Sequence, residues 1–399
     1  MRLRAVLAWM AVTAGACGLF AQSTAADAGR RGRAEGAMRR LMGKMGEALL
    51  YEADHPNRMI FATNVDRKTL DELKHVLTLY ARIQWRDLFA HRFDDYVTVI
   101  VPRQWEEGSS HGYYSHNSRQ VHCRSVGMVL MHEFTHALHH ADQRARGQRH
   151  PTWVSEGLAS LFESAEVCDR TLRVQPNHRA LVIRELAASR KCIPWAEFFR
   201  LSRGQFMDQP RACYAQARHI MLYLHEAGLL RAWYETYVAR FDSDPTGTTA
   251  VEMVLGKPLA DAEADWKKWV VRLATPPVGL DERRACLGVT VQSVIDGLRI
   301  GSVMTDSAAE KAGLRAGDVI VKVNSRRVVE HLALLSRIAA CRAGDELCVE
   351  VRRDGQYRDV QVVLQPLMSA AHRQTAAGRE EAPTDQRPGR VDDAFSGRP

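Results

Sequence analysis

Several features that would point to a particular function are missing from this 399-residue chain. No Cys-x-x-Cys spacing occurs among its eight cysteines, which argues against metal binding through paired thiolates. No basic segment is interleaved with aromatic residues, so we expect no nucleic-acid partner. Beyond the first 28 residues, no apolar run approaches the roughly 20 residues that cross a membrane. No internal repeat is visible, so the function has to be sought in local motifs.

The first residues resemble a secretory signal peptide. Arg2 and Arg4 precede an apolar run over residues 5–16, and small residues follow as far as Ala28. This order predicts a signal peptide at residues 1–28 and export to the bacterial periplasm or the extracellular space. Residues 13–17 loosely resemble a lipobox, so a lipid anchor at Cys17 is the alternative. The formal charge of +8 is modest. It suggests association with anionic envelope surfaces.

Seven cysteines remain when Cys17 is set aside. In an exported protein some of them can form disulfides, and the pairs Cys168–Cys192 and Cys341–Cys348 are candidates. Because the count is odd, we expect at least one buried free thiol.

Residues 132–136, His-Glu-Phe-Thr-His, carry the strongest chemical signal in the chain. Their apolar flanks predict a helix, on which His132 and His136 project from one face a single turn apart. Two imidazoles at this spacing can hold one zinc ion. Glu133 can lean over the same ion without binding it, in the position of a general base.

A second motif, Trp-Val-Ser-Glu-Gly-Leu-Ala at residues 153–159, supplies a third ligand. The nineteen residues between His136 and Glu156 suffice to end one helix, turn, and enter another that runs back alongside. The two motifs together resemble the gluzincins, the thermolysin-like zinc peptidases, and especially their peptidase-MA-like members. The resemblance implies that one Zn²⁺ ion is bound by His132, His136 and Glu156, with Glu133 as the base.

This resemblance implies an exported zinc metallopeptidase, in which zinc-activated water attacks a peptide carbonyl and Glu133 moves the proton. The competing hypothesis is a scaffold on the same fold that no longer turns over and only binds protein C-termini. A metzincin ligand set would use Asp142 instead, but the glycine which that pattern requires is replaced by His139, so the helix should continue and carry Asp142 off the metal face.

The family resemblance also assigns supporting roles. Glu163, seven residues after Glu156, is a candidate to orient a ligand imidazole. Tyr214 is the candidate to stabilise an oxyanion, with His219 as the alternative. The last strand before the zinc helix should form the exposed edge that pairs with an extended substrate. This edge strand would consist of Gln120, Val121, His122 and Cys123.

Periodicity predicts the elements around these motifs. Helices are expected at residues 38–53 and 68–89, strands at 59–63 and 96–101, and a hairpin at 112–123. An all-helical lobe should follow over residues 178–275, with helices at 181–189, 195–201, 213–227, 229–241 and 260–273.

The last third of the chain changes character. Residues 275–279, Thr-Pro-Pro-Val-Gly, break the last helix, and short strands with glycine turns follow. Residues 286–289, 307–314 and 317–320 resemble the corresponding segments of protease-associated PDZ domains. The resemblance implies a groove helix at residues 329–340 and closing strands at 347–351 and 357–364. It also implies a peptide groove in which Leu287, Gly288 and Val289 present N–H groups to a terminal carboxylate.

The predicted fold is therefore α+β, with two folded domains. The first combines a small sheet, the zinc helices and a helical lobe, and the second is a small β-rich PDZ domain that recruits or positions peptides. The predicted boundaries are 1–28 for the signal peptide, 29–275 for the gluzincin-like domain, 276–284 for a linker, 285–366 for the PDZ domain and 367–399 for a disordered tail.

Overall fold

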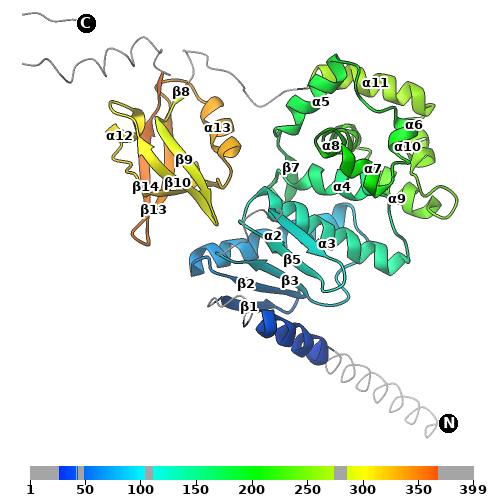
Figure 1. Cartoon of the computed structure of the whole chain (residues 1–399), viewed down its shortest axis with the longest axis horizontal. Coiled ribbons are helices and arrows are strands. Elements are labelled where there is room, and N and C mark those ends of the chain that lie inside the picture. The colour runs from blue at the N-terminus through cyan, green and yellow to red at the C-terminus, as the bar shows by residue number, and fades with distance from the viewer. Residues whose placement is uncertain (1–26, 42, 44–48, 104–110, 274–284, 367–399) are drawn as a thin grey trace, which may run out of the picture.

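The computed structural model describes residues 27–41, 43, 49–103, 111–273 and 285–366. It is a mixed α+β structure, in which one sheet and a helical lobe precede a small β-rich domain (Figure 1). The predicted signal peptide, except its last two residues, the predicted linker and the predicted tail lie outside the described residues. Within the described part of the chain, no helix is both long and apolar enough to span a bilayer.

The first sheet has five strands in the order β1-β2-β3-β5-β4. Strands β2, β3 and β5 run parallel to one another, whereas β1 and β4 are antiparallel to their neighbours. The strand bounds are Leu50–Asp54 for β1, Met59–Thr63 for β2, Val97–Val101 for β3, Gly112–Ser115 for β4 and Gln120–Cys123 for β5.

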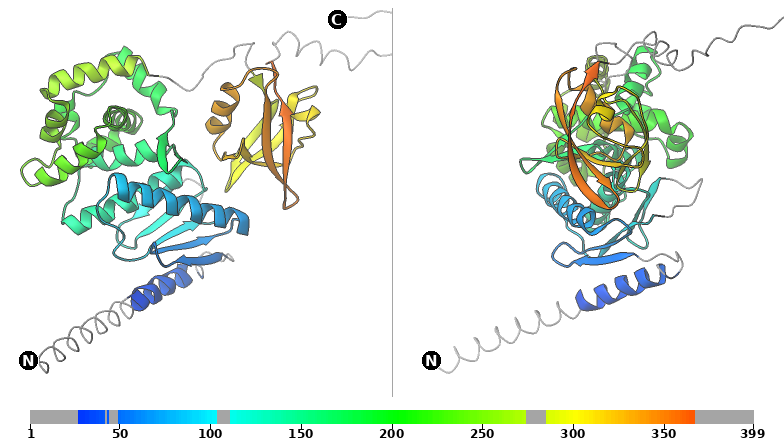
Figure 2. Two further views of the ribbon diagram at one scale, coloured as in Figure 1. Left: turned by 180° about the vertical axis from the view of Figure 1, so that it is seen from behind. Right: turned by 90° about the vertical axis from the view of Figure 1, so that its left-hand side faces the viewer.

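Both faces of this sheet are covered, which explains why every residue of β2 and β3 is buried. Alternate residues of a strand point to opposite faces. The odd-numbered residues of β2 and β3 pack with α2 (Arg67–Asp87) and α3 (Met128–Arg146), and the even-numbered residues Ile60 and Ile100 pack with Met38. The helix at residues 27–41 lies on the side of the sheet opposite α2 (Figure 2).

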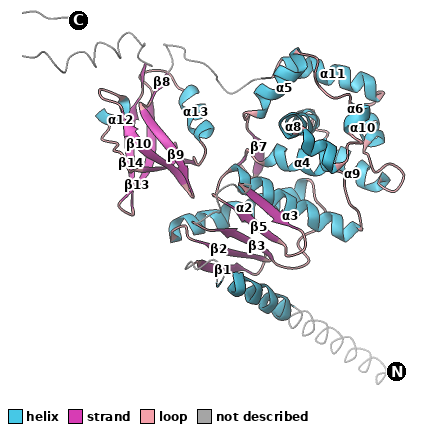
Figure 3. Cartoon of the chain, viewed as in Figure 1, coloured by secondary structure: helices cyan, strands magenta, loops and turns pink. Residues whose placement is uncertain are grey.

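The helical lobe surrounds α8 (Pro210–Glu226), which is seen end-on in the middle of the other helices (Figure 3). Helix α4 (Thr152–Phe162) packs closely against α8 at Gly157, where a Cβ would lie 3.0 Å from Met221 Cγ. The other helices are α5 (Arg179–Ala188), α6 (Trp195–Phe198), α7 (Arg203–Asp208), α9 (Leu230–Arg240), α10 (Thr248–Leu255) and α11 (Leu259–Val271).

The C-terminal domain has a sheet of order β14-β13-β11-β10-β9, with β12 paired to β11, and a separate β8–β15 pair. Its core is its own cluster of buried aliphatic side chains. Its strands are β8 (Ala285–Cys286), β9 (Val289–Val294), β10 (Gly297–Val303), β11 (Val319–Val323), β12 (Arg326–Arg327), β13 (Glu346–Arg353), β14 (Gln356–Val363) and β15 (Gln365–Pro366); its helices are α12 (Ala308–Lys311) and α13 (His331–Ala339).

Two sequence-based expectations about the fold are wrong. The helix predicted at residues 38–53 ends early, because Leu50–Asp54 pairs with β2 as a strand. The two candidate disulfides do not form, since all seven cysteines that the structure describes are free. Two of these, Cys123 and Cys213, are buried thiols, as expected. Periodicity also missed α7, α10 and the hairpin of β6 (Ala165–Cys168) and β7 (Thr171–Val174).

Buried neutral histidines should make the protein sensitive to acid. Burial lowers the pKa of His122 to about 4 and the pKa of His150 and His219 to about 3. Each imidazole takes up a proton near pH 6.5 in the unfolded chain but only near pH 3–4 in the folded protein. Below pH 6.5 the unfolded state therefore binds more protons, and stability falls as the pH decreases.

We accordingly expect the urea midpoint of unfolding to fall steadily between pH 6.5 and pH 4. Each such histidine contributes a slope of up to about 1.4 kcal/mol per pH unit. A His150→Gln variant should show a shallower dependence by up to one proton, because its side chain does not titrate. A free energy of unfolding that is constant over this range would contradict the argument.

Candidate functional site

Helix α3 presents His132 and His136 side by side. Their Nε2 atoms lie 3.2 Å apart, as expected for residues four apart on one helix face. Leu130, Phe134 and Leu138 are fully buried on another side of the same helix. This apolar stripe fixes the rotation of α3, so the two imidazoles turn away from the sheet.

Glu156 on α4 completes the cluster. Its Oε2 atom lies 3.2 Å from Nε2 of His132 and 3.3 Å from Nε2 of His136. The potential ligand atoms of the three residues all lie within 4.8 Å of one another. Over the residues placed in the structure, no other group of three His, Cys, Asp or Glu side chains has this arrangement.

The electrostatics of this cluster favour a positive charge in its centre. Burial by itself raises the pKa of Glu156, but the imidazoles of His136 and His132 outweigh it and hold that pKa well below its usual value. Burial likewise opposes protonation of His132, yet hydrogen bonds to two carboxylates raise its pKa to about 10. A nearly enclosed carboxylate with two imidazoles is a donor set that fits a divalent cation.

Glu163 contacts the cluster through His132. Its Oε2 atom accepts a hydrogen bond from Nδ1 of His132 at 3.0 Å, which leaves Nε2 of that imidazole directed at Glu156. Asn177 and Arg179 each donate to Oε1 of Glu163 at 2.8 Å. Periodicity gave no signal for Asn177 or Arg179, because they lie fourteen and sixteen residues after Glu163, in the loop before α5 and at the first position of α5.

The end of α4 is held by Arg218, which sequence reasoning also missed. Its guanidinium is fully buried and donates to the carbonyls of Ser160 and Leu161 and to the hydroxyl of Ser164. These carbonyls belong to the last turn of α4, where no further helical N–H is available to them. Arg218 therefore fixes the end of α4 just before Glu163.

The two predicted catalytic side chains lie beside the cluster. Glu133 is partly exposed and follows His132 on α3. The ring centroid of Tyr214 lies 6.1 Å from that of His132, and the guanidinium carbon of Arg179 lies 5.0 Å from the Tyr214 ring centroid. Burial, reinforced by Glu156, raises the pKa of Tyr214, so its phenol stays protonated at neutral pH and can donate a hydrogen bond.

The alternative to Tyr214 lies elsewhere. His219 is buried within α8, where Nδ1 bonds to the carbonyl of Ala215 at 2.7 Å. Asp142 also lies apart from the cluster, in a buried network with His91, Arg146 and Tyr234.

The predicted substrate-binding edge is wrong. Strand β5, which contains Gln120, Val121, His122 and Cys123, is an inner strand of the sheet. It pairs with β3 on one side and β4 on the other, so both of its edges are occupied. The edge strand is β4, where Tyr113 is 48% exposed and stacks on His122 with ring centroids 4.6 Å apart.

A loop before β9 forms a second candidate site. The carbonyl of Leu287 accepts from the N–H of Ala309, and the carbonyl of Gly288 accepts from the N–H of Met304, both at 2.9 Å. Because C=O and the following N–H point in opposite directions across a trans peptide, the N–H groups of Gly288 and Val289 point away from these partners. Gly288 has φ +81°, which favours glycine.

Beside this loop, β9 offers a free strand edge. Among the described strands it is paired only with β10, and α13 runs along its open side. Leu332 and Leu335 on α13 are 36% and 41% exposed. An extended chain could add to β9 as a further strand while its apolar side chains contact these leucines.

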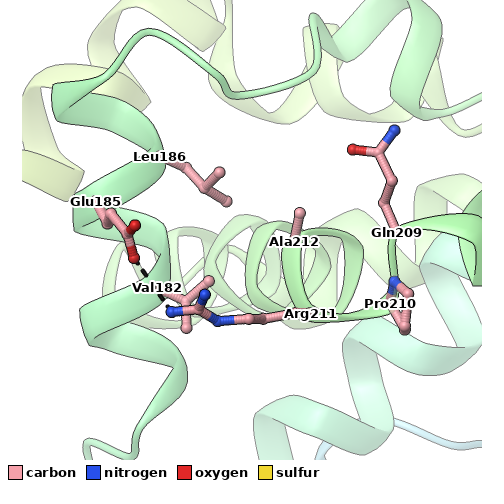
Figure 4. A pocket seen from close by; sticks show the side chains of 7 residues that line it. All are labelled: Val182, Glu185, Leu186, Gln209, Pro210, Arg211 and Ala212. Atoms are coloured by element: carbon pink, nitrogen blue, oxygen red, sulfur yellow. Dashed lines mark hydrogen bonds and ion pairs between the residues drawn. The ribbon is translucent and has the colours of Figure 1, made fainter.

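A cavity in the helical lobe is separate from both sites. Its volume is about 230 Å³, and it lies between α5 and the start of α8 (Figure 4). An ion pair between Glu185 and Arg211 lies at its wall. None of the predicted catalytic, metal-binding or peptide-binding residues lines this cavity.

Comparison with known families identifies the C-terminal domain. Residues 285–364 match the PDZ domain family, so a PDZ domain is present at the C-terminal end. A probable periplasmic serine protease do/HhoA-like of Haemophilus influenzae is 38% identical over 73 residues, which cover 18% of this chain and 16% of the relative. Periplasmic serine endoprotease DegP of Escherichia coli K12 is 33% identical over 69 residues, covering 17% and 15%. The chain thus spans about one sixth of the length of these relatives.

Solved structures give the same kind of match. The HtrA-type protease AlgWS227A with decapeptide is 23% identical, with a TM-score of 0.22 and coverage of 22% of this chain and 31% of that one. The HtrA3 PDZ domain bound to a phage-derived ligand is 22% identical, with a TM-score of 0.20 and coverage of 22% and 92%.

These comparisons contradict the predicted zinc metallopeptidase. The relatives are named serine proteases, a catalytic type that needs no zinc, so the predicted zinc-dependent function, gluzincin-type peptidase activity and Zn²⁺ cofactor are corrected. The matched segments of 69 and 73 residues are no longer than the PDZ region. The names of these relatives therefore assign no serine nucleophile to residues 27–273.

Proposed function

We propose that this chain is an exported peptide-binding protein whose PDZ domain captures extended segments by their terminal carboxylate. The main support for this proposal is the edge of β9 that is unpaired among the described strands. This strand begins at a loop in which the N–H groups of Gly288 and Val289 point away from the hydrogen-bond partners of the neighbouring carbonyls. Those donors suit a carboxylate, and the edge suits an added strand. The HtrA3 PDZ domain was solved bound to a phage-derived ligand, FGRWV, and we propose a peptide ligand for this PDZ domain as well.

Export is part of the proposal. The relatives' names place them in the periplasm, and the first 28 residues have the order of a signal peptide. We propose that the PDZ domain comprises residues 285–366 and that a separate domain comprises residues 29–275. A lipid anchor at Cys17 stays an alternative.

Peptide capture can be measured directly. A C-terminal peptide library displayed on phage would be selected on the full chain, and the selected decapeptide made as the free acid and as the C-terminal amide. We expect the amide to bind at least about tenfold more weakly in fluorescence anisotropy, because it lacks the charge that strengthens hydrogen bonds from backbone N–H groups. Equal affinity of the two forms would rule out carboxylate capture.

A second proposal concerns a cation site formed by His132, His136 and Glu156. We propose that these three side chains hold a divalent cation in a gluzincin-like helix pair, and that Glu163 orients His132. The support is the mutual distance of their ligand atoms within 4.8 Å and the negative charge buried beside them. Glu133 is the proposed base beside this site, and Tyr214 the proposed donor to an oxyanion.

A further inference from the structure

Helix α3 begins without a capping side chain of its own. Its N-cap residue is Gly127, no side chain of the N-cap accepts from the first turn, and the first turn contains no acidic residue. The first N–H groups of a helix have no partner within it, and a negative charge there is stabilising. The helix that carries His132 and His136 therefore depends on another part of the chain at this end.

The PDZ domain supplies the missing cap. The N–H of Met128 donates to Oε1 of Glu330 at 2.7 Å, across 202 positions of sequence. Glu330 is itself the N-cap residue of α13, the helix beside the peptide groove. Next to this contact, the N–H of Val126 donates to the carbonyl of Ile295 at 2.9 Å. Val329 of the PDZ domain is 3% exposed and belongs to the apolar core of the first domain.

Gly127 is shaped for this contact. A Cβ at this position would lie 1.8 Å from Oε1 of Glu330 and 2.7 Å from its Cδ. The φ of Gly127 is −106°, a value open to any residue, so the glycine is required by the approach of Glu330 and not by its own φ.

The other end of α13 contacts β6, the strand that follows the second helix of the cluster. Arg337 donates to Oε1 of Glu166 at 2.5 Å, and Arg326 donates to Oε2 at 2.5 Å. Glu166 lies in β6, three residues after Glu163 and close to the end of α4. Glu330 and Arg337 are seven residues apart and so share one face of α13, while the exposed Leu332 and Leu335 lie on another.

We infer that the PDZ domain is a built-in clamp of the cation site, in which Glu330 is a positioning residue that fixes the start of α3 while Arg337 fixes the strand after α4. The inference rests on the proposed cation site and assigns it a regulator, the groove helix of the same chain. Separation of the domains would free the first turn of α3, four residues before His132, and so loosen the geometry of the ligand pair.

The test uses the full chain with Co²⁺ as the probe, whose dissociation constant is measured by calorimetry and by visible absorption. Glu330→Ala and Gly127→Ala should each weaken Co²⁺ binding about fivefold, the usual size of a lost cap. Glu346→Ala, an exposed carboxylate of the same domain, and Gly204→Ala, where an added Cβ meets nothing closer than 3.9 Å, should leave it unchanged. Hydrogen exchange at Met128–Met131 should accelerate only in the first pair.

The double variant decides whether one contact is responsible. Because Gly127→Ala acts by displacing the Glu330 carboxylate, it should add nothing in the Glu330→Ala background. Additive losses would overturn the clamp, and so would unchanged Co²⁺ affinity in Glu330→Ala when the wild type binds the ion. Absence of Co²⁺ binding in the wild type would instead overturn the cation site on which the clamp rests.

Discussion

Replacing His136 with alanine is expected to abolish divalent-metal binding, with an affinity loss of at least about 1,000-fold. The substitution removes one of the three proposed ligands, whose potential ligand atoms lie within 4.8 Å of one another. Glu156 then faces a single imidazole, and no other His, Cys, Asp or Glu among the described residues is placed to replace the lost nitrogen. Equilibrium dialysis against Co²⁺, followed by metal analysis of the protein, measures the effect.

A matched control lies one turn further along the same helix. His140 is partly buried, and its Nδ1 is 3.0 Å from the hydroxyl of Tyr114. Its imidazole is therefore hydrogen-bonded to a residue outside the cluster. His140→Ala removes an imidazole from α3 without removing a proposed ligand, and should bind Co²⁺ as the wild type does. Equal loss in both variants would point to damage to α3 as a whole, and retained binding in His136→Ala would remove it from the ligand set.

The sequence predicted that His132, His136 and Glu156 lie together, but it did not predict the residues that support them. Spacing on a helix determines which side chains share a face, so His132 and His136 could be placed together from five residues. Glu163 could be proposed from its seven-residue offset to Glu156. Asn177 and Arg179, which bind Glu163, lie in the loop before α5 and at the start of α5, and no periodicity links these two positions to α4.

Errors in the sequence-based fold arose where long-range pairing decides the outcome. The two strands of a hairpin are readily predicted from the sequence. Which of them becomes an inner strand of the sheet depends on which one pairs with β3. Strand β3 pairs with β5, so the edge strand on this side of the sheet is β4 and not β5 as predicted. For the same reason Glu330 gave no signal, since its partner Met128 lies in another domain.

Substitution of Gly288 tests the peptide groove most severely. A Cβ on Gly288 would lie 2.3 Å from Cβ of Ser307, so the loop must move away from α12 and carry its N–H groups with it. We expect Gly288→Ala to weaken binding of the free-acid decapeptide about 100-fold, which corresponds to about 2.7 kcal/mol. Fluorescence anisotropy with the full chain gives the dissociation constant.

The alanine also brings the strain of a positive φ, and this has to be separated from the collision. Gly313 has φ +78°, close to the +81° of Gly288, but a Cβ there would meet no atom within 4 Å. Gly313→Ala therefore shares the cost of about 1–2 kcal/mol in stability and lacks the displacement of the loop. If both variants lowered the urea midpoint but only Gly288→Ala lost the peptide, the loss would belong to the carboxylate loop. Equal peptide affinity in the two variants would mean that the terminal carboxylate is bound elsewhere.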